Sequence, residues 1–471
     1  MKPQPFFKGL SWLIFLNLLV KPVWIFAIDR QVQNSLGHEA YGKYFAVLNF
    51  TIILSFLADA GLTNMVNQRI AQGTPLNVKR LLRIKLLLLL AYLLLCLLAS
   101  VLAGTGAMEI VLYAAAIQAL ASLSVFLRGI ITANQLFQTD ALLSVLDKLG
   151  VILLCGVFIY LPYLFGGISL QRFLLVQAAC LAAAAAAAFL VISRKRLLPQ
   201  DAPAEEVMPM LKAMLPFTLI LLLMALHYRL DGFLLERLHP NGAYEAGVYA
   251  ASYRLLDAAN VVGYLAASFL VPFVARNAQD PHRSGQALLY VRHGLMAAAV
   301  LAVCFCLVFA PWVMQLLYHT NDPYHAGVLR WCVASLPGYM LVHVYGSALT
   351  ATRRFKSFLS ILLLCACLNA AANIYFLPRY GALAACIAAL FSQALCGILC
   401  FLAAAKQLRI GYHWRSLALY LVCGIVVLAG LHASKAALLN VWIILAVVVL
   451  AVLLFLFTQM GRLKKIFLSL R

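Results

Sequence analysis

The chain has 471 residues, of which 65% are hydrophobic and only 11% are charged, and its formal net charge is +21. Soluble domains carry roughly a quarter charged residues, so this composition excludes an ordinary soluble fold. Basic chains often bind nucleic acid, but here the cations alternate between rich and poor connecting segments, which argues against a nucleic-acid partner. The sequence predicts an all-α polytopic membrane protein of about 14 transmembrane helices.

The predicted helices are apolar runs of about twenty residues, the length that crosses roughly 30 Å of hydrocarbon. In chain order, those of the first half lie at 9–29, 43–67, 82–103, 108–132, 140–164 and 169–193. Those of the second half lie at 208–236, 245–275, 287–317, 326–352, 355–377, 380–405, 414–432 and 437–459. In the first helix Pro22 follows Lys21, and because proline removes a backbone hydrogen bond we expect a break or bend there.

The distribution of cations predicts the orientation. Of the 36 Lys and Arg residues, 25 fall on one side of the predicted membrane, seven on the other and four inside helices. Cytoplasmic loops are the basic ones, so both termini are predicted to be cytoplasmic. The predicted layout is an N-terminal lobe at 1–196 (helices 1 to 6), a cytoplasmic linker at 197–206, a C-terminal lobe at 207–405 (helices 7 to 12), and helices 13 and 14 with a basic tail at 406–471.

A short internal echo indicates that the two lobes are related. Glu39-Ala40-Tyr41-Gly42 opens the second helix of the first half, and Glu245-Ala246-Gly247 opens the second helix of the other. An aspartate, Asp29 or Asp231, lies shortly upstream in each case, near the outer end of the preceding helix. Repeats of this kind are common in transporters, so the echo predicts two parallel six-helix repeats followed by two extra helices.

Four cations lie inside apolar segments: Lys21, Lys148, Arg229 and Arg254. A cation at the centre of a helix costs roughly 2.5 to 3.5 kcal/mol on insertion, so we expect these side chains to line an interior cavity and bind an anionic substrate. Snorkelling and local ion pairing are the alternatives. Arg254 and Asp257 are spaced i, i+3, and Arg229 lies near the outer interface.

The predicted intramembrane acids are Asp59, Asp147, Asp231 and Asp257. Asp59 has no counter-charge nearby in the sequence, so it is the first candidate for ion or proton coupling, with Asp231 and Asp257 beside it. The alternative is that Asp59 caps or anchors a neighbouring helix. The intramembrane histidines His227 and His343 are expected to be satisfied polar groups.

Several chemical motifs are missing from the sequence. It has no GxxxxGK[ST] loop for ATP, no HExxH and no CxxC spacing, so neither a metal site nor a cofactor is predicted. The twelve cysteines lie within or beside apolar segments and are expected to be core residues.

Three sets of motifs resemble those of a known family. They are Tyr41-Gly42-Lys43-Tyr44 with Leu57-Ala58-Asp59-Ala60-Gly61-Leu62, then Arg229-Leu230-Asp231 with Gly247-Val248-Tyr249-Ala250-Ala251-Ser252-Tyr253-Arg254, and finally Asn369 to Asn373 with Phe376-Leu377-Pro378-Arg379-Tyr380-Gly381-Ala382. With them the chain resembles the polysaccharide flippases of the multidrug/oligosaccharidyl-lipid/polysaccharide (MOP) exporter superfamily, especially the O-antigen, Wzx-type members.

The resemblance implies an alternating-access transporter with a central cavity between two six-helix lobes, as in the MATE and MurJ proteins. The implied cargo is an undecaprenyl-pyrophosphate-linked oligosaccharide, carried from the inner to the outer leaflet of the bacterial cytoplasmic membrane. The implied partners are membrane lipids, a coupling ion (H+ or Na+) and other polysaccharide-assembly proteins.

Two kinds of alternative stay open. A lipid II flippase or a multidrug exporter would use the same architecture for a different cargo. A membrane oligosaccharide polymerase or ligase would be an enzyme acting on the same carrier, but the predicted outer loops are short and hold no clustered catalytic set.

Overall fold

The computed structural model describes residues 12, 15–17, 19–71, 77–104, 106–195, 197, 207–277, 279–411, 414–438 and 440–451. Within these residues all regular structure is helical, and eleven helical runs are long and apolar enough to cross a membrane. Contacts within the chain divide it into two compact units, Met1–Gly247 and Val248–Arg471.

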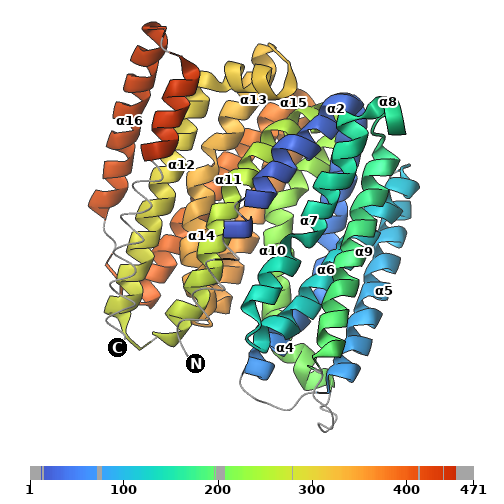
Figure 1. The fold of residues 1–471 in the computed structure, drawn as a ribbon. Helices are drawn as coiled ribbons and strands as arrows, with labels where there is room; N and C mark the ends of the chain where they lie inside the picture. The colour runs from blue at the N-terminus through green and yellow to red at the C-terminus, as the bar shows by residue number, and fades with distance from the viewer. Residues whose placement is uncertain are drawn as a thin grey trace. The chain divides into compact units, whose positions relative to one another are not determined.

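The first unit contains η1 (Trp24–Asp29), α2 (Arg30–Leu54), α3 (Phe56–Asp59), α4 (Leu62–Ala71), α5 (Val78–Leu102), α6 (Met108–Ala133), α7 (Phe137–Tyr160), α8 (Pro162–Phe165), α9 (Leu170–Arg194), α10 (Val207–Leu238) and the first turn of α11 (Gly242–Arg276). Helices α5, α6, α7 and α9 form a bundle (Figure 1), in which α6 packs against the other three. Its core includes Phe126 and Ile130 of α6 and Ala188 of α9, all almost fully buried. These helices form because their sequences are uninterrupted apolar runs.

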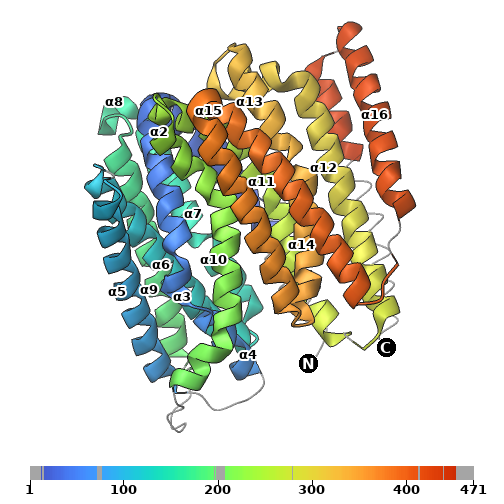
Figure 2. The same ribbon diagram turned by 180° about the vertical axis from the view of Figure 1, so that it is seen from behind.

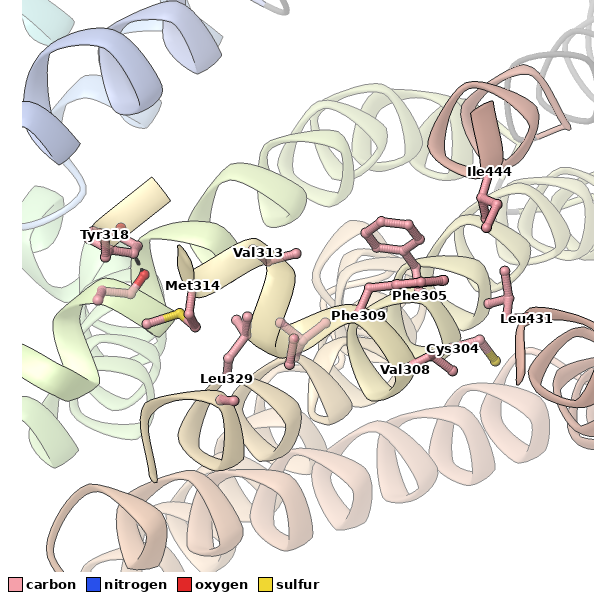
Figure 3. Close-up of a cluster of buried hydrophobic side chains, with 14 residues drawn as sticks. Cys304, Phe305, Val308, Phe309, Val313, Met314, Tyr318, Leu329, Leu431 and Ile444 are labelled. Carbon is pink, nitrogen blue, oxygen red and sulfur yellow. Dashed lines mark hydrogen bonds between the residues drawn. The ribbon is translucent and has the colours of Figure 1, made fainter. Parts of the chain in front are cut away.

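The second unit contains the rest of α11, then α12 (Pro281–Tyr318), α13 (Pro323–Ala334), α14 (Leu336–Ala351), α15 (Phe355–Gln407) and α16 (Trp414–Ala436), with a shorter apolar helix at Val441–Ala451. Helix α12 is its centre, because it packs against α13, α14 and α16. Figure 3 shows Phe305 and Phe309 of α12 in one buried cluster with Leu329 of α13 and Leu431 of α16.

Helix α15 is a membrane hairpin. A straight helix of its 53 residues would measure about 80 Å, more than twice the hydrocarbon thickness. Gly381 breaks it with φ 55° and ψ −137°, values that suit glycine, and the two arms lie side by side (Figure 2). Gln407 Nε2 donates to Ser357 Oγ at 2.6 Å, which ties the far ends of the arms together.

The first membrane run, Phe15–Asp59, is likewise interrupted by a glycine. Gly37 has φ 78° and ψ 168°, which divides the run into two arms at the place where the sequence predicts a turn between helices. The irregularity expected at Pro22 is present as the π-helix η1, which begins two residues later. The predicted number of fourteen helices stays a prediction, because the last predicted helix, at 437–459, falls partly outside the described residues.

The contact-based units do not coincide with the predicted lobes. Helix α10 packs against α2 and belongs to the first unit, although the sequence analysis placed it in the lobe 207–405. The predicted lobes are based on the internal sequence repeat, whereas the two units are defined by contacts between residues. The predicted domain layout therefore stays a proposal. Of the predicted linker 197–206, all but Leu197 lies outside the described residues.

The two echoed glycines contact one another. In the first unit, a Cβ atom added at Gly42 would overlap the carbonyl oxygen of Ala243, and one added at Gly247 would overlap that of His38. Gln33 Nε2 also donates to the Gly247 carbonyl at 2.9 Å. The glycines are therefore needed for close backbone approach between α2 and the first turn of α11.

We expect Gly42→Ala to lower the midpoint of thermal unfolding in detergent, because the added methyl group must push the α11 backbone away. Overpacking of this kind typically costs about 1–3 kcal/mol. The matched control is Gly156→Ala in α7, where an added Cβ meets nothing within 4 Å. Equal midpoints for the two variants would contradict the close approach.

Candidate substrate and ion sites in the membrane

A group of cations gathers on one side of the first unit. Lys148 of α7 lies 3.2 Å from the carboxylate of its neighbour Asp147, and its Nζ lies 4.5 Å from the centroid of the Trp24 ring. Lys21, one turn before Trp24, interacts electrostatically with Lys148, Arg128 and Asp147. We call Lys21, Arg128 and Lys148 the cationic cluster.

Spacing along two helices explains why this cluster forms. Asn17, Lys21 and Trp24 are spaced i, i+4, i+7, so they share one face of the first helix. That face meets α7, where Asn17 Nδ2 donates to Ser144 Oγ at 2.9 Å, one turn from Lys148. The first unit therefore brings the faces that carry Lys21 and Lys148 together, while the predicted common cavity with Arg229 and Arg254 stays a prediction.

The cationic cluster has features of an anion site. Arg128 is held by Asp140 at 2.6 Å, and the exposed fractions of the two side chains are 22% and 6%. Lys148 is 23% exposed. The indole Nε1 of Trp24 is buried and has no hydrogen-bond partner among the described residues. An N–H group without a hydrogen-bond partner, next to partly exposed ammonium groups, can donate a hydrogen bond to an anion that enters the site.

The other two predicted substrate cations lie elsewhere in the fold. Arg229 is half-buried on α10 in the first unit, two residues before the buried Asp231. Arg254 is 7% exposed on α11, and together with the half-buried Asp257 it belongs to the second unit. Their convergence with the cationic cluster stays a prediction.

The structure corrects the environment predicted for Asp59. The sequence shows no local counter-charge, but Lys85 of α5 lies 2.6 Å from Asp59 Oδ1, and its own side chain is 0% exposed. The carboxylate also accepts the hydroxyl and the backbone N–H of Thr63, the second residue of α4. These contacts favour the anchoring and capping alternative, while a role in coupling stays a prediction.

Three cations that the sequence analysis counted with the cytoplasmic loops contact other helices instead. Lys85 is fully buried, Arg128 pairs with Asp140, and Arg292 of α12 is 1% exposed. Each stands within a turn or two of the end of its predicted helix, where sequence alone does not show whether the side chain points to the loop or to a neighbouring helix. Removing them from the loop count leaves the predicted orientation unchanged.

A cluster of uncharged polar side chains occupies the α15 hairpin. Asn369, Asn373, Ser392 and Gln393 are each at most 5% exposed, and we call them the amide cluster. Asn369 Nδ2 donates to Ser392 Oγ at 3.2 Å, and Asn373 Nδ2 donates to Asn369 Oδ1 at 3.0 Å. Both amide atoms of Gln393 are buried with no partner among the described residues. In the sequence, Asn369 and Asn373 stand out only as part of a motif shared with the family.

Amide and hydroxyl oxygens are ligands for hard cations, so the amide cluster could hold one. The described residues contain no group of three or more His, Cys, Asp and Glu side chains suited to a metal ion. The backbone of α14 packs closely against the amide cluster at Gly338. A Cβ atom added there would lie 2.6 Å from the backbone carbonyl carbon of Gln393.

The expectation for His343 is met only in part within the described residues. This α14 side chain is 3% exposed and lies 4.6 Å from Tyr264, but its Nε2 has no hydrogen-bond partner there. Its ring packs where a Cβ at position 263 would stand, so Gly263 makes room for it.

Comparison with known proteins decides the family. Residues 6–278, more than half of the chain, match the family model described as polysaccharide biosynthesis protein. The chain belongs to this family. No curated protein matches the sequence.

Solved structures share the fold. An inward-facing multidrug resistance MATE transporter of the MOP superfamily has a TM-score of 0.61 at 17% identity, covering 84% of this chain and 94% of its own. A variant of the Vibrio cholerae MATE transporter VcmN gives 0.62 at 15%, covering 86% and 97%. The lipid II flippase MurJ, in an inward closed conformation, gives 0.61 at 10%, covering 92% and 99%.

The shared fold confirms the predicted fold class, an all-helical membrane protein like the MATE transporters and MurJ. This family member is a multi-pass membrane protein whose fold resembles those of the MATE transporters and MurJ.

Proposed function

We propose that this protein flips a polyprenyl-pyrophosphate-linked oligosaccharide from the inner to the outer leaflet of the bacterial cytoplasmic membrane by alternating access, with both termini in the cytoplasm. The cationic cluster carries the proposal. A pyrophosphate crossing a low-dielectric region needs cations and N–H donors along its path, and Lys21, Lys148 and the Trp24 indole supply them. Arg229 and Arg254 are proposed as further substrate contacts.

The proposed coupling ion is H+ or Na+. We keep Asp231 and Asp257 as the acids proposed for this role, since both are intramembrane carboxylates. The amide cluster is a further candidate, because its buried oxygens include the Gln393 side-chain oxygen, to which no described residue donates a hydrogen bond. Asp59 already holds the Lys85 ammonium, so it is a less suitable acid for an exchangeable cation.

The test of the cationic cluster is transport in proteoliposomes. We expect the double variant Lys21→Gln with Lys148→Gln to flip fluorescent undecaprenyl-pyrophosphate-oligosaccharide at least about tenfold more slowly, because two anion contacts are lost. Lys43→Gln is the matched control, since Lys43 is a surface lysine of α2 whose side chain is 51% exposed. An undiminished rate in the double variant would overturn the assignment.

A lipid II flippase is the second candidate, favoured by the fold shared with MurJ over nearly the whole of both chains. Lipid II also carries a pyrophosphate, so the cationic cluster suits both cargoes. Offering the two lipids to the same proteoliposomes separates them, because the proposal expects faster flipping of the oligosaccharide carrier. Export of a cationic drug, with no flipping of either lipid, would favour the multidrug alternative.

A further inference from the structure

The Lys85 ammonium lies in a binding position built by three helices of the first unit. Its Nζ lies 2.6 Å from Asp59 Oδ1 of α3 and donates to Ser122 Oγ of α6 at 2.8 Å. The Phe126 ring of α6 faces it with the centroid 5.6 Å away. A carboxylate, a hydroxyl oxygen and an aromatic face are the groups that bind an ammonium ion.

Hydrogen bonds from Thr63 hold the Asp59 carboxylate in place independently of Lys85. The chain turns sharply between α3 and α4, where Ala60 and Gly61 have φ values of 45° and 79°. Asp59 Oδ2 accepts the Thr63 N–H at 3.3 Å, and Oδ1 accepts the Thr63 hydroxyl. The carboxylate thus caps α4 while its Oδ1 points to Lys85, so the anionic half of the position is preorganised by the break in the helix.

The fit of the ammonium in this position is close. The Lys85 side chain is 0% exposed, whereas 20% of the Asp59 side chain remains exposed. Burying an ammonium in this way is costly unless its partners are in place, so the contacts with Asp59 and Ser122 are required rather than incidental. The exposed part of Asp59 also provides a route by which a small molecule can reach the position if the lysine side chain is removed.

The second unit contains a related arrangement. Arg292 of α12, the third membrane helix of the second predicted repeat, donates from Nη1 to Tyr345 OH of α14 at 3.0 Å. Its guanidinium lies 5.6 Å from the centroid of the Phe401 ring. In both units a buried cation donates to a hydroxyl of the next membrane run and lies near an aromatic ring, which in the second unit comes from a different helix, α15.

We propose that Lys85 is a built-in cation, whose ammonium permanently fills a monovalent-cation position made by Asp59, Ser122 and Phe126. Without the lysine side chain this position is a binding site for small organic ammonium ions. One consequence rests on the proposed function. The exchangeable coupling ion of that function binds elsewhere, because Lys85 already fills this position.

Chemical rescue tests the proposal. Lys85→Ala removes three carbons and the ammonium, which together correspond to n-propylammonium. We expect the purified full-length variant to unfold at a lower temperature than wild type. Adding n-propylammonium about a hundredfold above its Kd should raise the midpoint by about 2–4 °C. The wild-type midpoint should not respond, because Lys85 fills the site.

Controls separate this binding from general effects of salt or solvent. Lys79→Ala removes an exposed lysine from the same helix and should show no rescue. Propanol has no charge, and tetramethylammonium cannot donate a hydrogen bond, so neither should stabilise Lys85→Ala. The double variant Asp59→Asn with Lys85→Ala lacks the anion and should not respond. Rescue by propanol, rescue of the double variant, or no rescue of Lys85→Ala overturns the proposal.

A second comparison tests the proposal even if Lys85→Ala does not fold. Asp59→Asn with Lys85→Met removes both charges while keeping side-chain volume, and it should unfold at a higher temperature than Asp59→Asn alone. If the two midpoints are equal, Lys85 does not depend on Asp59 and the built-in cation is wrong. Because these readouts are unfolding temperatures, they are independent of whether the cargo is correctly identified.

Discussion

Replacing Asp59 by asparagine is expected to lower the free energy of unfolding by about 3–5 kcal/mol, because the substitution leaves the fully buried Lys85 ammonium without its carboxylate. Asparagine can still accept the Thr63 N–H, so the cap of α4 is partly kept and the loss is chiefly electrostatic. The measurement is thermal or denaturant unfolding in detergent, followed by intrinsic fluorescence.

The control for this prediction is a more exposed ion pair in the same part of the fold. Asp147→Asn affects a pair with Lys148, whose side chain is 23% exposed, and it should cost less than Asp59→Asn. If Asp59→Asn unfolds at the wild-type temperature and instead changes only the response of transport to an imposed ion gradient, Asp59 is a coupling residue and its structural role is wrong.

Replacing Arg254 by glutamine is expected to slow flipping by at least about tenfold, because a largely buried guanidinium that contacts a pyrophosphate supplies paired, charge-assisted hydrogen bonds. Arg254→Lys should be impaired less, since it keeps the charge but not the two-pronged contact. The rates are measured in proteoliposomes containing equal amounts of each variant.

Two further variants show whether the slower flipping by Arg254→Gln comes from a lost contact with the substrate. Arg276→Gln changes an exposed arginine at the end of the same helix and should flip at the wild-type rate. Asp257→Asn tests the i, i+3 pair. If the double variant Arg254→Gln with Asp257→Asn recovers both stability and flipping, Arg254 is only an ion-pair partner.

Most helices could be predicted from the sequence because the length of an apolar run is a local property. The predicted helix at 108–132 is α6, Met108–Ala133, and the one at 169–193 is α9, Leu170–Arg194. The break at Ala60 could not be predicted, because alanine is a good helix former and a left-handed alanine is imposed by its surroundings. The predicted helix at 43–67 is therefore divided into parts of α2, α3 and α4.

The candidate sites could be predicted less completely, because they depend on which face of a helix meets which neighbour. Lys85 follows Lys79, Arg80 and Arg83 at the start of α5, and this basic run is typical of a cytoplasmic helix end. Its partner Asp59 is 26 residues away in the chain. One usable signal was present, since an unpaired acid in one helix requires a cation at a similar depth in another.

The grouping of Lys21 with Lys148 was predictable from energetics, but the contribution of Trp24 was not. A tryptophan in an apolar helix is usually a packing residue, and only the arrangement around it shows that its ring faces Lys148 and that its N–H is buried without a described partner. The amide cluster was missed for a similar reason, since isolated Asn, Ser and Gln residues gain significance only when the α15 hairpin brings them together.

The most direct test of the central claim compares three fluorescent lipids in proteoliposomes of the wild-type protein. The lipids are an undecaprenyl-pyrophosphate-linked oligosaccharide, the same glycan on an undecaprenyl monophosphate, and the same glycan on an uncharged polyprenol. We expect the pyrophosphate-linked lipid to be flipped fastest and the uncharged lipid to be flipped no faster than in protein-free vesicles. Equal flipping of all three, or of none, would contradict recognition of a lipid-linked pyrophosphate.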